Sequence, residues 1–231
     1  MRLLSAHRTL CWLAVLTTCL ALAFYAQFEA GLPAYAVTEL HAGQTAIGLA
    51  AATNCATIAA FQMVMLRITD RQAPGPLLVV VGLIWVACWT LLGAAAVLPV
   101  SWGAVIFVAT YGVFALGETI FTPILSPLVA RLAPAGIVGT ALGVFGGLQT
   151  MFSALGPLIA AVSFGLGLPV LFVGVHLALS MVAVLAAGRL AVLLSVRSAP
   201  LTLGPSPVPR GCACSPQLTS MMDGSNRSTA D

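Results

Sequence analysis

The sequence contains no lysine and very little charge of any kind. Only 6% of its 231 residues are charged, and its basic residues are nine arginines. Soluble domains carry about 25% charged residues, so this chain cannot cover a water-facing surface with polar groups. Because 60% of the residues are hydrophobic, the composition predicts a protein that lies in a lipid bilayer. The net charge of +3 is too small to indicate a nucleic-acid partner.

Signatures of catalysis and of metal binding are also missing. The sequence has no G-x-S-x-G turn, no H-E-x-x-H helix and no phosphate-binding loop. Its histidines, His7, His41 and His176, lie far apart, and it has no C-x-x-C pair of the kind found in zinc sites. We therefore expect no enzyme activity, no metal and no cofactor. An intramembrane enzyme is the least favoured class.

Six apolar stretches are each long enough to cross a bilayer, whose hydrocarbon core of about 30 Å requires about 20 helical residues. Turn-forming Gly and Pro residues separate these stretches. They comprise residues 9–37, 45–66, 76–98, 102–132, 137–164 and 169–196. The sequence thus predicts an all-α integral membrane fold, with six transmembrane helices in residues 1–197. Residues 198–231 are rich in Ser, Pro and Gly, and we expect them to form a disordered cytoplasmic tail.

The arginines predict the orientation of these helices. Arg67, Arg71 and Arg131 lie in connections that share one side of the membrane if both termini are cytoplasmic, and the other connections contain no arginine. Arginine is enriched in cytoplasmic segments. We therefore expect a multi-pass protein of the inner (plasma) membrane with cytoplasmic N- and C-termini. A cleaved signal peptide after Arg2 and Arg8 is the alternative, although the apolar run is longer than such peptides require.

Glu118 is a carboxylic acid in the middle of the fourth apolar stretch. Burial disfavours the charged form of a carboxyl group, so Glu118 can hold a proton and release it when water enters. Ionisable residues inside transmembrane helices often mark ion or substrate pathways. Helical spacing places Tyr111 and Thr122 on the same face, and Pro123 and Pro127 are expected to break or kink the helix nearby. The competing interpretation is a permanently protonated, purely structural Glu118.

Other polar residues in these stretches are secondary candidates. Glu29 lies in the outer half of the first stretch, and it is either a second proton- or cation-coupling residue or a carboxylate at the membrane surface. Tyr111, Asn54 and Gln149 are candidates for lining a substrate cavity. Polar side chains in membrane helices also commonly hydrogen-bond to neighbouring helices, and this structural role is the alternative for all three.

The fifth stretch is rich in glycine. Gly139, Gly143 and Gly147 recur every four residues and form a smooth stripe along which another helix can approach closely. Gly156 and Pro157 follow further along and predict a kink. These five residues are therefore candidates for helix packing.

Two sequence motifs, together with this organisation, resemble one half of a major facilitator superfamily transporter. Asp70-Arg71 stands where the family has G-x-x-x-D-R-x-G-R-R, with Leu66 in place of the first glycine. In the fifth stretch, Gly143 and Gly156-Pro157 fall on the family's antiporter pattern. The segment 117–134 is similar to the tenth helix of drug-efflux members, and the degenerate first-half motif favours the second half of such a transporter.

The resemblance implies a half bundle built as a 3+3 inverted repeat, because each half of these transporters contains two inverted three-helix repeats. It also implies transport of a small solute, by proton-coupled efflux, with Glu118 and Glu29 as coupling residues. A second six-helix half or a second copy of this chain would complete the transporter. The alternative is a non-transporting membrane interaction module or an inactive transporter remnant.

Overall fold

The structure, a computed structural model, describes residues 2–95 and 97–198; the expected cytoplasmic tail lies outside these residues. The described part is helical and has no strand. It contains six membrane-spanning candidates, Arg8–Phe28, Gln44–Arg71, Pro74–Ala95, Val100–Leu132, Val138–Gly165 and Pro169–Val196. The predicted all-α fold with six helices long and apolar enough to cross a membrane is confirmed, and these helices suggest a multi-pass membrane protein.

Four of the six spans are built on single long helices. These are α4 (Gln44–Arg71), α5 (Pro74–Ala95), α6 (Gly103–Leu132) and α9 (Pro169–Ser198). A short 3-10 turn, Val100–Trp102, precedes α6. The lengths follow from uninterrupted apolar sequence, since the membrane requires every backbone polar group to be satisfied within the helix.

The first and fifth spans are interrupted. The first consists of α1 (Arg2–Leu20), a π-helical turn (Ala21–Tyr25), α2 (Ala26–Phe28) and α3 (Gly31–Thr38). The fifth consists of α7 (Val138–Ser153) and α8 (Gly156–Gly165), which are separated at the position where Gly156-Pro157 predicts a kink. The π-helical turn carries no proline or glycine, so nothing in its local sequence announces it.

Of the break or kink expected at Pro123 and Pro127, the break does not occur, because α6 is continuous from Gly103 to Leu132. Each proline removes one backbone donor, but the side chains around them, such as Ile124 and Leu128, are buried against neighbouring helices. Packing on several sides therefore holds this part of α6 helical. Similarly, Asp70-Arg71 forms the end of α4 and not a loop, since the first helix-breaking residue comes only at Pro74.

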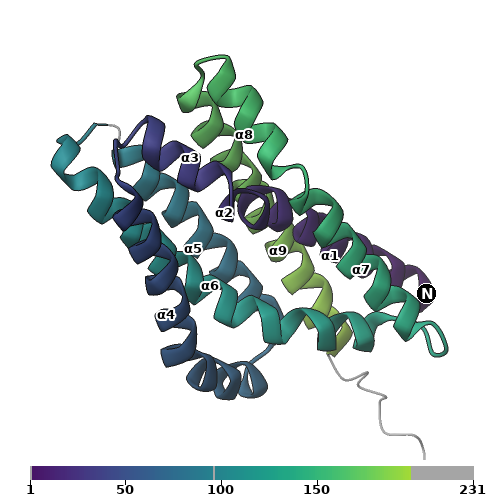
Figure 1. The fold of residues 1–231 in the computed structure, drawn as a ribbon. Coiled ribbons are helices and arrows are strands. Elements are labelled where there is room, and N and C mark those ends of the chain that lie inside the picture. Colours follow the sequence, from purple (N-terminus) through teal and green to yellow (C-terminus); the bar gives the residue numbers. More distant parts are fainter. Residues whose placement is uncertain (1, 96, 199–231) are drawn as a thin grey trace, which may run out of the picture. The chain divides into compact units, whose positions relative to one another are not determined.

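The centre of the bundle is the packing of α5 against α9 and α6, with α1 on the other side of α9 (Figure 1). Glycines permit the close approach of α5 to α9. A Cβ atom added to Gly75 would lie 2.7 Å from the Ala191 Cα, and one added to Gly82 would lie 2.8 Å from the Val184 Cγ2. Such close backbone approach is the main way in which helices associate in membranes.

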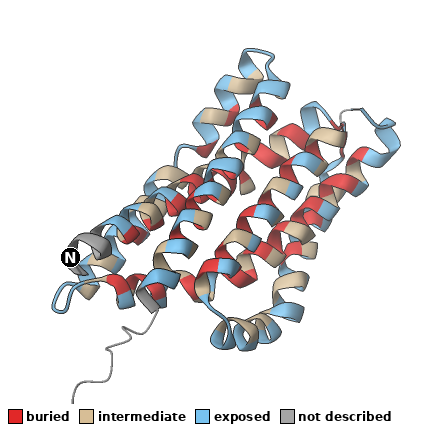
Figure 2. Cartoon of the chain, turned by 180° about the vertical axis from the view of Figure 1, so that it is seen from behind, coloured by how far each residue is buried: buried red, intermediate tan, exposed pale blue. Residues whose placement is uncertain are grey.

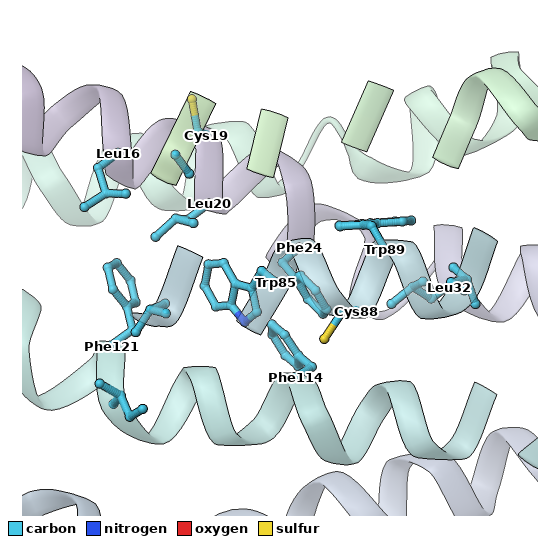
Figure 3. Packing of buried hydrophobic residues seen from close by; sticks show 14 of the residues in the cluster. Leu16, Cys19, Leu20, Phe24, Leu32, Trp85, Cys88, Trp89, Phe114 and Phe121 are labelled. Atoms are coloured by element: carbon cyan, nitrogen blue, oxygen red, sulfur yellow. The ribbon is translucent and has the colours of Figure 1, made fainter. Parts of the chain in front are cut away.

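Aromatic side chains fill the space between the first span, α5 and α6 (Figure 3). The rings of Phe24 and Phe114 stack with centroids 3.5 Å apart and planes 3° apart. Trp85 lies over the same pair, 5.2 Å from Phe24 and 5.4 Å from Phe114. These contacts come from three different spans, so they fix the relative positions of the helices that carry the polar residues described below.

Burial is very uneven among the helices (Figure 2). On α5, the buried side chains run along its whole length. On α4, by contrast, only Ala50 and Asn54 are buried, and on α7 only Phe145 is buried. Helix α4 packs mainly on α6, and α7 packs on α6 and on the first span. The remaining faces of α4 and α7 have no neighbour within the described chain.

Candidate functional site

Glu118 lies on α6 and is half-buried, between the aromatic core and α4. The side-chain amide of Asn54, on α4, donates a hydrogen bond to its carboxyl group. The same Asn54 Nδ2 atom also donates to the backbone carbonyl of Tyr111, at 3.5 Å. The structure thus brings together Glu118, Asn54 and the Tyr111 backbone, which the sequence suggested separately.

Tyr25 approaches Glu118 from the other side. It is the last residue of the π-helical turn, and its hydroxyl shares a hydrogen bond with Thr122, one turn beyond Glu118 on α6. Its ring meets Trp85 edge-on at 6.0 Å and Phe114 at 6.1 Å. A π-helical turn shifts the helix face that follows it, and such turns are frequent at functional sites. Sequence spacing relates Tyr25 only to Glu29, and its proximity to Glu118 is a tertiary feature.

Tyr111 is buried and closes the interruption of the first span. Its hydroxyl donates to the backbone carbonyl of Phe28 at 2.7 Å, and the two rings lie 4.7 Å apart. Phe28 is the last residue of α2. A carbonyl left without its helical partner at membrane depth is costly, and Tyr111 supplies the missing donor. Its role in lining a substrate cavity stays a prediction.

A pocket of about 520 Å³ lies between the interruptions of the first and fifth spans. Glu29 and Gln149 both line it, so the structure also brings these two candidates together. Hydroxyl groups of Thr150 and Ser153 add further hydrogen-bonding capacity. The lining consists of Tyr25, Ala26, Glu29, Ala30, Gln149, Thr150, Ser153, Ala154 and Pro157.

Tyr25 belongs to both regions. It contacts the Glu118 neighbourhood through Thr122 and lines the pocket with Glu29. Glu118 and Asn54 are not part of the pocket lining. The candidate site is therefore a carboxyl group held by an amide on one side of Tyr25, and an open pocket with carboxylate, amide and hydroxyl groups on the other. Such groups can bind and release a proton and can hydrogen-bond to a small polar solute.

The glycines of the fifth span behave differently from one another. A Cβ atom on Gly156 would overlap the Ala26 backbone carbonyl, so the two interrupted spans cross there in direct backbone contact. By contrast, no atom of the described chain lies within 4 Å of a Cβ built on Gly139, Gly143 or Gly147. The contact expected for this stripe is therefore not made within residues 2–95 and 97–198.

A second set of buried polar groups lies where the first span meets α9. Gln27 is fully buried, and neither atom of its amide has a hydrogen-bond partner among the described residues. His176 is also fully buried; its Nδ1 lies 2.6 Å from the Phe172 carbonyl oxygen, and its Nε2 has no partner in the described part. The His176 ring stacks on Trp89 at 4.6 Å. A lone histidine among aromatics has no partner acid here, so we assign these groups no chemistry.

Within residues 2–95 and 97–198, no group of three or more His, Cys, Asp or Glu side chains gathers as a metal site would require. No protein family, curated protein or solved structure matches this chain.

Proposed function

We propose that this chain is one six-helix half of a major facilitator-type transporter and moves a small solute across the plasma membrane in exchange for protons. The observation that carries the proposal is the order in which its helices pack. A 3+3 inverted repeat would exchange the first span with α6, α4 with the fifth span, and α5 with α9. Two pairings of the described helices are compatible with this exchange, whereas the contacts of α7 with α6 and of α8 with α9 have no comparable counterpart.

Two pairings support the proposal. The repeat would relate the contact between α4 and α6 to a contact between the fifth span and the first span. This second contact is present, since α7 packs on α1 and on the π-helical turn that follows α1. The repeat would likewise relate the contact between α5 and α6 to a contact between α9 and the first span. This contact is also present, since α9 packs on α1. The contact of α5 with α9, along the centre of the bundle, would map onto itself and adds no separate support.

The open faces of α4 and α7 support a partner, either a second six-helix half or a second copy of this chain. In membranes, helix interfaces are rich in small residues, whereas large aliphatic side chains suit lipid. Small residues follow one another along both open faces, as Gly48, Ala52 and Ala56 on α4 and Gly139, Gly143 and Gly147 on α7. Large apolar residues are also exposed on both helices, such as Met63 on α4 and Val144 on α7, as they are on the outward face of α9.

The proposed mechanism separates the two sides of Tyr25. Glu118 binds and releases the proton, because its carboxyl group is half-buried and accepts a hydrogen bond that favours the ionised form. The pocket beside Glu29 and Gln149 receives the solute through hydrogen bonds. Glu29 is exposed and remains the second candidate for coupling. A solute with hydrogen-bond donors suits a pocket whose only charged side chain is a carboxylate.

Flux through vesicles tests the proposal. The full chain is reconstituted in phosphatidylethanolamine–phosphatidylglycerol vesicles, a pH gradient is imposed, and proton movement is followed with an internal pH dye while hydrophobic amines and dyes are added. We expect solute-dependent proton movement that Glu118→Gln abolishes, because the amide cannot ionise. Glu39→Gln, at an exposed carboxyl group beyond α3, is the matched control. Full proton-coupled flux in Glu118→Gln would remove Glu118 from the mechanism.

Orientation has its own test. We propose that both termini are cytoplasmic, since Arg67, Arg71 and Arg131 all lie exposed at one set of helix ends. A C-terminal reporter that is active only in the periplasm should stay inactive, and a reporter inserted at His41 should be active. The opposite pattern would overturn this topology.

The second candidate is a non-transporting module that binds another membrane protein. The open glycine stripe on α7 favours it, because this surface needs no transport activity to bind a helix. Stable association with a partner, combined with no solute flux in the vesicles, would select this function over transport.

A further inference from the structure

Helix α4 is attached to the bundle mainly through one neighbour, α6. Of its 28 residues, Ala50 and Asn54 are the buried ones, and Asn54 is 5% exposed. The helix runs beside α6 at an edge of the bundle (Figure 1). The two helices come close at this level, since a Cβ added to Gly112 would lie 3.2 Å from the Thr53 Cγ2. Asn54 is therefore the buried polar anchor of α4.

The anchor has two acceptors of different kinds. A primary amide has two N–H groups, and Asn54 directs its Nδ2 atom to the Tyr111 backbone carbonyl and to the Glu118 carboxyl group. The carbonyl is a constant acceptor. The carboxyl group changes, because a hydrogen bond to an ionised carboxylate is about twice as strong as one between neutral groups. Losing the charge thus weakens half of the anchor.

Few other ionisable groups lie near Asn54 and could change its hydrogen bonding with pH. Tyr25 faces Glu118 from the first span. Helix α7 contributes no ionisable side chain. The thiol of Cys88, on α5, donates to the Thr110 carbonyl. The other ionisable groups on or beside the elements packed against α6, among the side chains that the structure describes, are Cys55, Arg67, Asp70 and Arg71 of α4, Arg8, Cys11 and Cys19 of α1, Glu29 and Glu39 on either side of α3, Tyr35 of α3 and, on α6 itself, Arg131 and Tyr111.

We propose that Asn54 makes the packing of α4 against α6 depend on the charge of Glu118. Ionised Glu118 holds α4 in place, and protonation loosens it. The inference rests on the proposed role of Glu118 as the proton-binding residue. It adds that proton binding at Glu118 changes the position of the outward face of α4, the face whose small residues are proposed to contact a partner helix.

Asparagine itself provides the probe. The chain contains two asparagines, Asn54 and Asn226, so a chain labelled with ¹⁵N-asparagine gives two side-chain amide signals, and Asn226→Gln identifies them. A ¹³C-methyl label on methionine reports on α4 through Met65, which is half-buried against the core. Both signals are followed in lipid nanodiscs of phosphatidylcholine and phosphatidylglycerol from about pH 5 to about pH 9.

In the wild type we expect the Asn54 amide and the Met65 methyl signal to change together with pH, and Met65 to become more mobile on the acid side. Glu118→Gln should abolish both pH responses while the Asn54 signal persists. Asn54→Leu should abolish the Met65 response. Gln62→Leu, which removes another half-buried amide from the same helix, should leave it intact.

Two results would overturn the proposal. One is an Asn54 signal that still responds to pH in Glu118→Gln, and the other is an unchanged Met65 response in Asn54→Leu. If Asn54→Leu does not fold, Glu118→Gln alone decides the outcome, since it keeps Asn54 in place. The experiment uses no solute, so its result is independent of the flux experiment: α4 can respond to Glu118 in a chain that transports nothing, and the reverse also holds.

Discussion

Helices α5 and α7 both carry glycines that suggest close packing, yet the structure uses only those of α5. Gly75 and Gly82 lie against the backbone and side chains of α9, whereas Gly139, Gly143 and Gly147 face open space. The two sets cannot be told apart by composition, because a small-residue stripe indicates only that a helix can approach. The difference teaches that α5 holds this chain together, while α7 is available to something outside it.

Filling the packed glycines should have the largest effect. Gly75→Val places side-chain atoms where the Ala191 backbone lies, and overpacking of this kind costs about 3 kcal/mol. We expect most of this loss in the free energy of unfolding, measured by denaturant titration in mild detergent. Gly174→Val, on the open face of α9, is the control and should be close to neutral. Equal stability of the two variants would remove the distinction between the helices.

Filling the open glycines should affect assembly and leave the fold intact. Gly143→Leu has room within the chain, so we expect normal stability, whereas association with a second copy or a second half should weaken roughly tenfold, about 1.4 kcal/mol. Energy transfer between labelled chains in vesicles measures this. Val182→Leu, on the outward face of α9, should not change association. A chain that is monomeric in vesicles, and indifferent to Gly143→Leu, would show that the α7 stripe faces lipid.

Removing one hydrogen bond from the closely packed region should have the smallest effect. Tyr111→Phe keeps the ring contact with Phe28 but loses the 2.7 Å bond to its carbonyl, which is worth about 1 kcal/mol. We expect that decrease in unfolding free energy, with Tyr35→Phe compared in parallel to account for the general loss of a tyrosine hydroxyl. No difference between the variants would mean that Tyr111 does not support the interruption after α2.

Much of the fold could be predicted from the sequence because apolar length is a direct measure of a membrane span. The six stretches agree with the observed spans to within a few residues at most ends. Helix interruptions were harder to predict, since they depend on packing as well as on local chemistry. Gly156-Pro157 marks a real interruption, whereas Pro123 and Pro127 lie inside a continuous α6, and the π-helical turn at Ala21–Tyr25 has no sequence signal.

The candidate site was predictable residue by residue but not as an arrangement. Glu118 stands out because a carboxyl group is costly in an apolar segment. Its pairing with Asn54, and the position of Tyr25 between Glu118 and the pocket, depend on how three spans cross. A sequence without aligned relatives contains no local pattern that reports such contacts. The structure therefore adds Tyr25 to the candidate site and shows that the Tyr111 hydroxyl donates to the Phe28 carbonyl.

The crossing of Gly156 over the Ala26 carbonyl has a mechanical consequence. Both spans are interrupted at this level, and the segments beyond the interruptions, α3 and α8, pack on each other, with α8 also packing on α9. Helix ends can absorb the dihedral changes of hinge motions. We therefore expect α3 and α8 to tilt together as one rigid unit about the contact between Gly156 and Ala26, next to the pocket that Tyr25 and Glu29 line. Labels at Val37 and Val162, both exposed, should then keep their separation while each moves relative to Val15 on α1. This movement requires glycine at position 156, because any side chain there would overlap the Ala26 carbonyl.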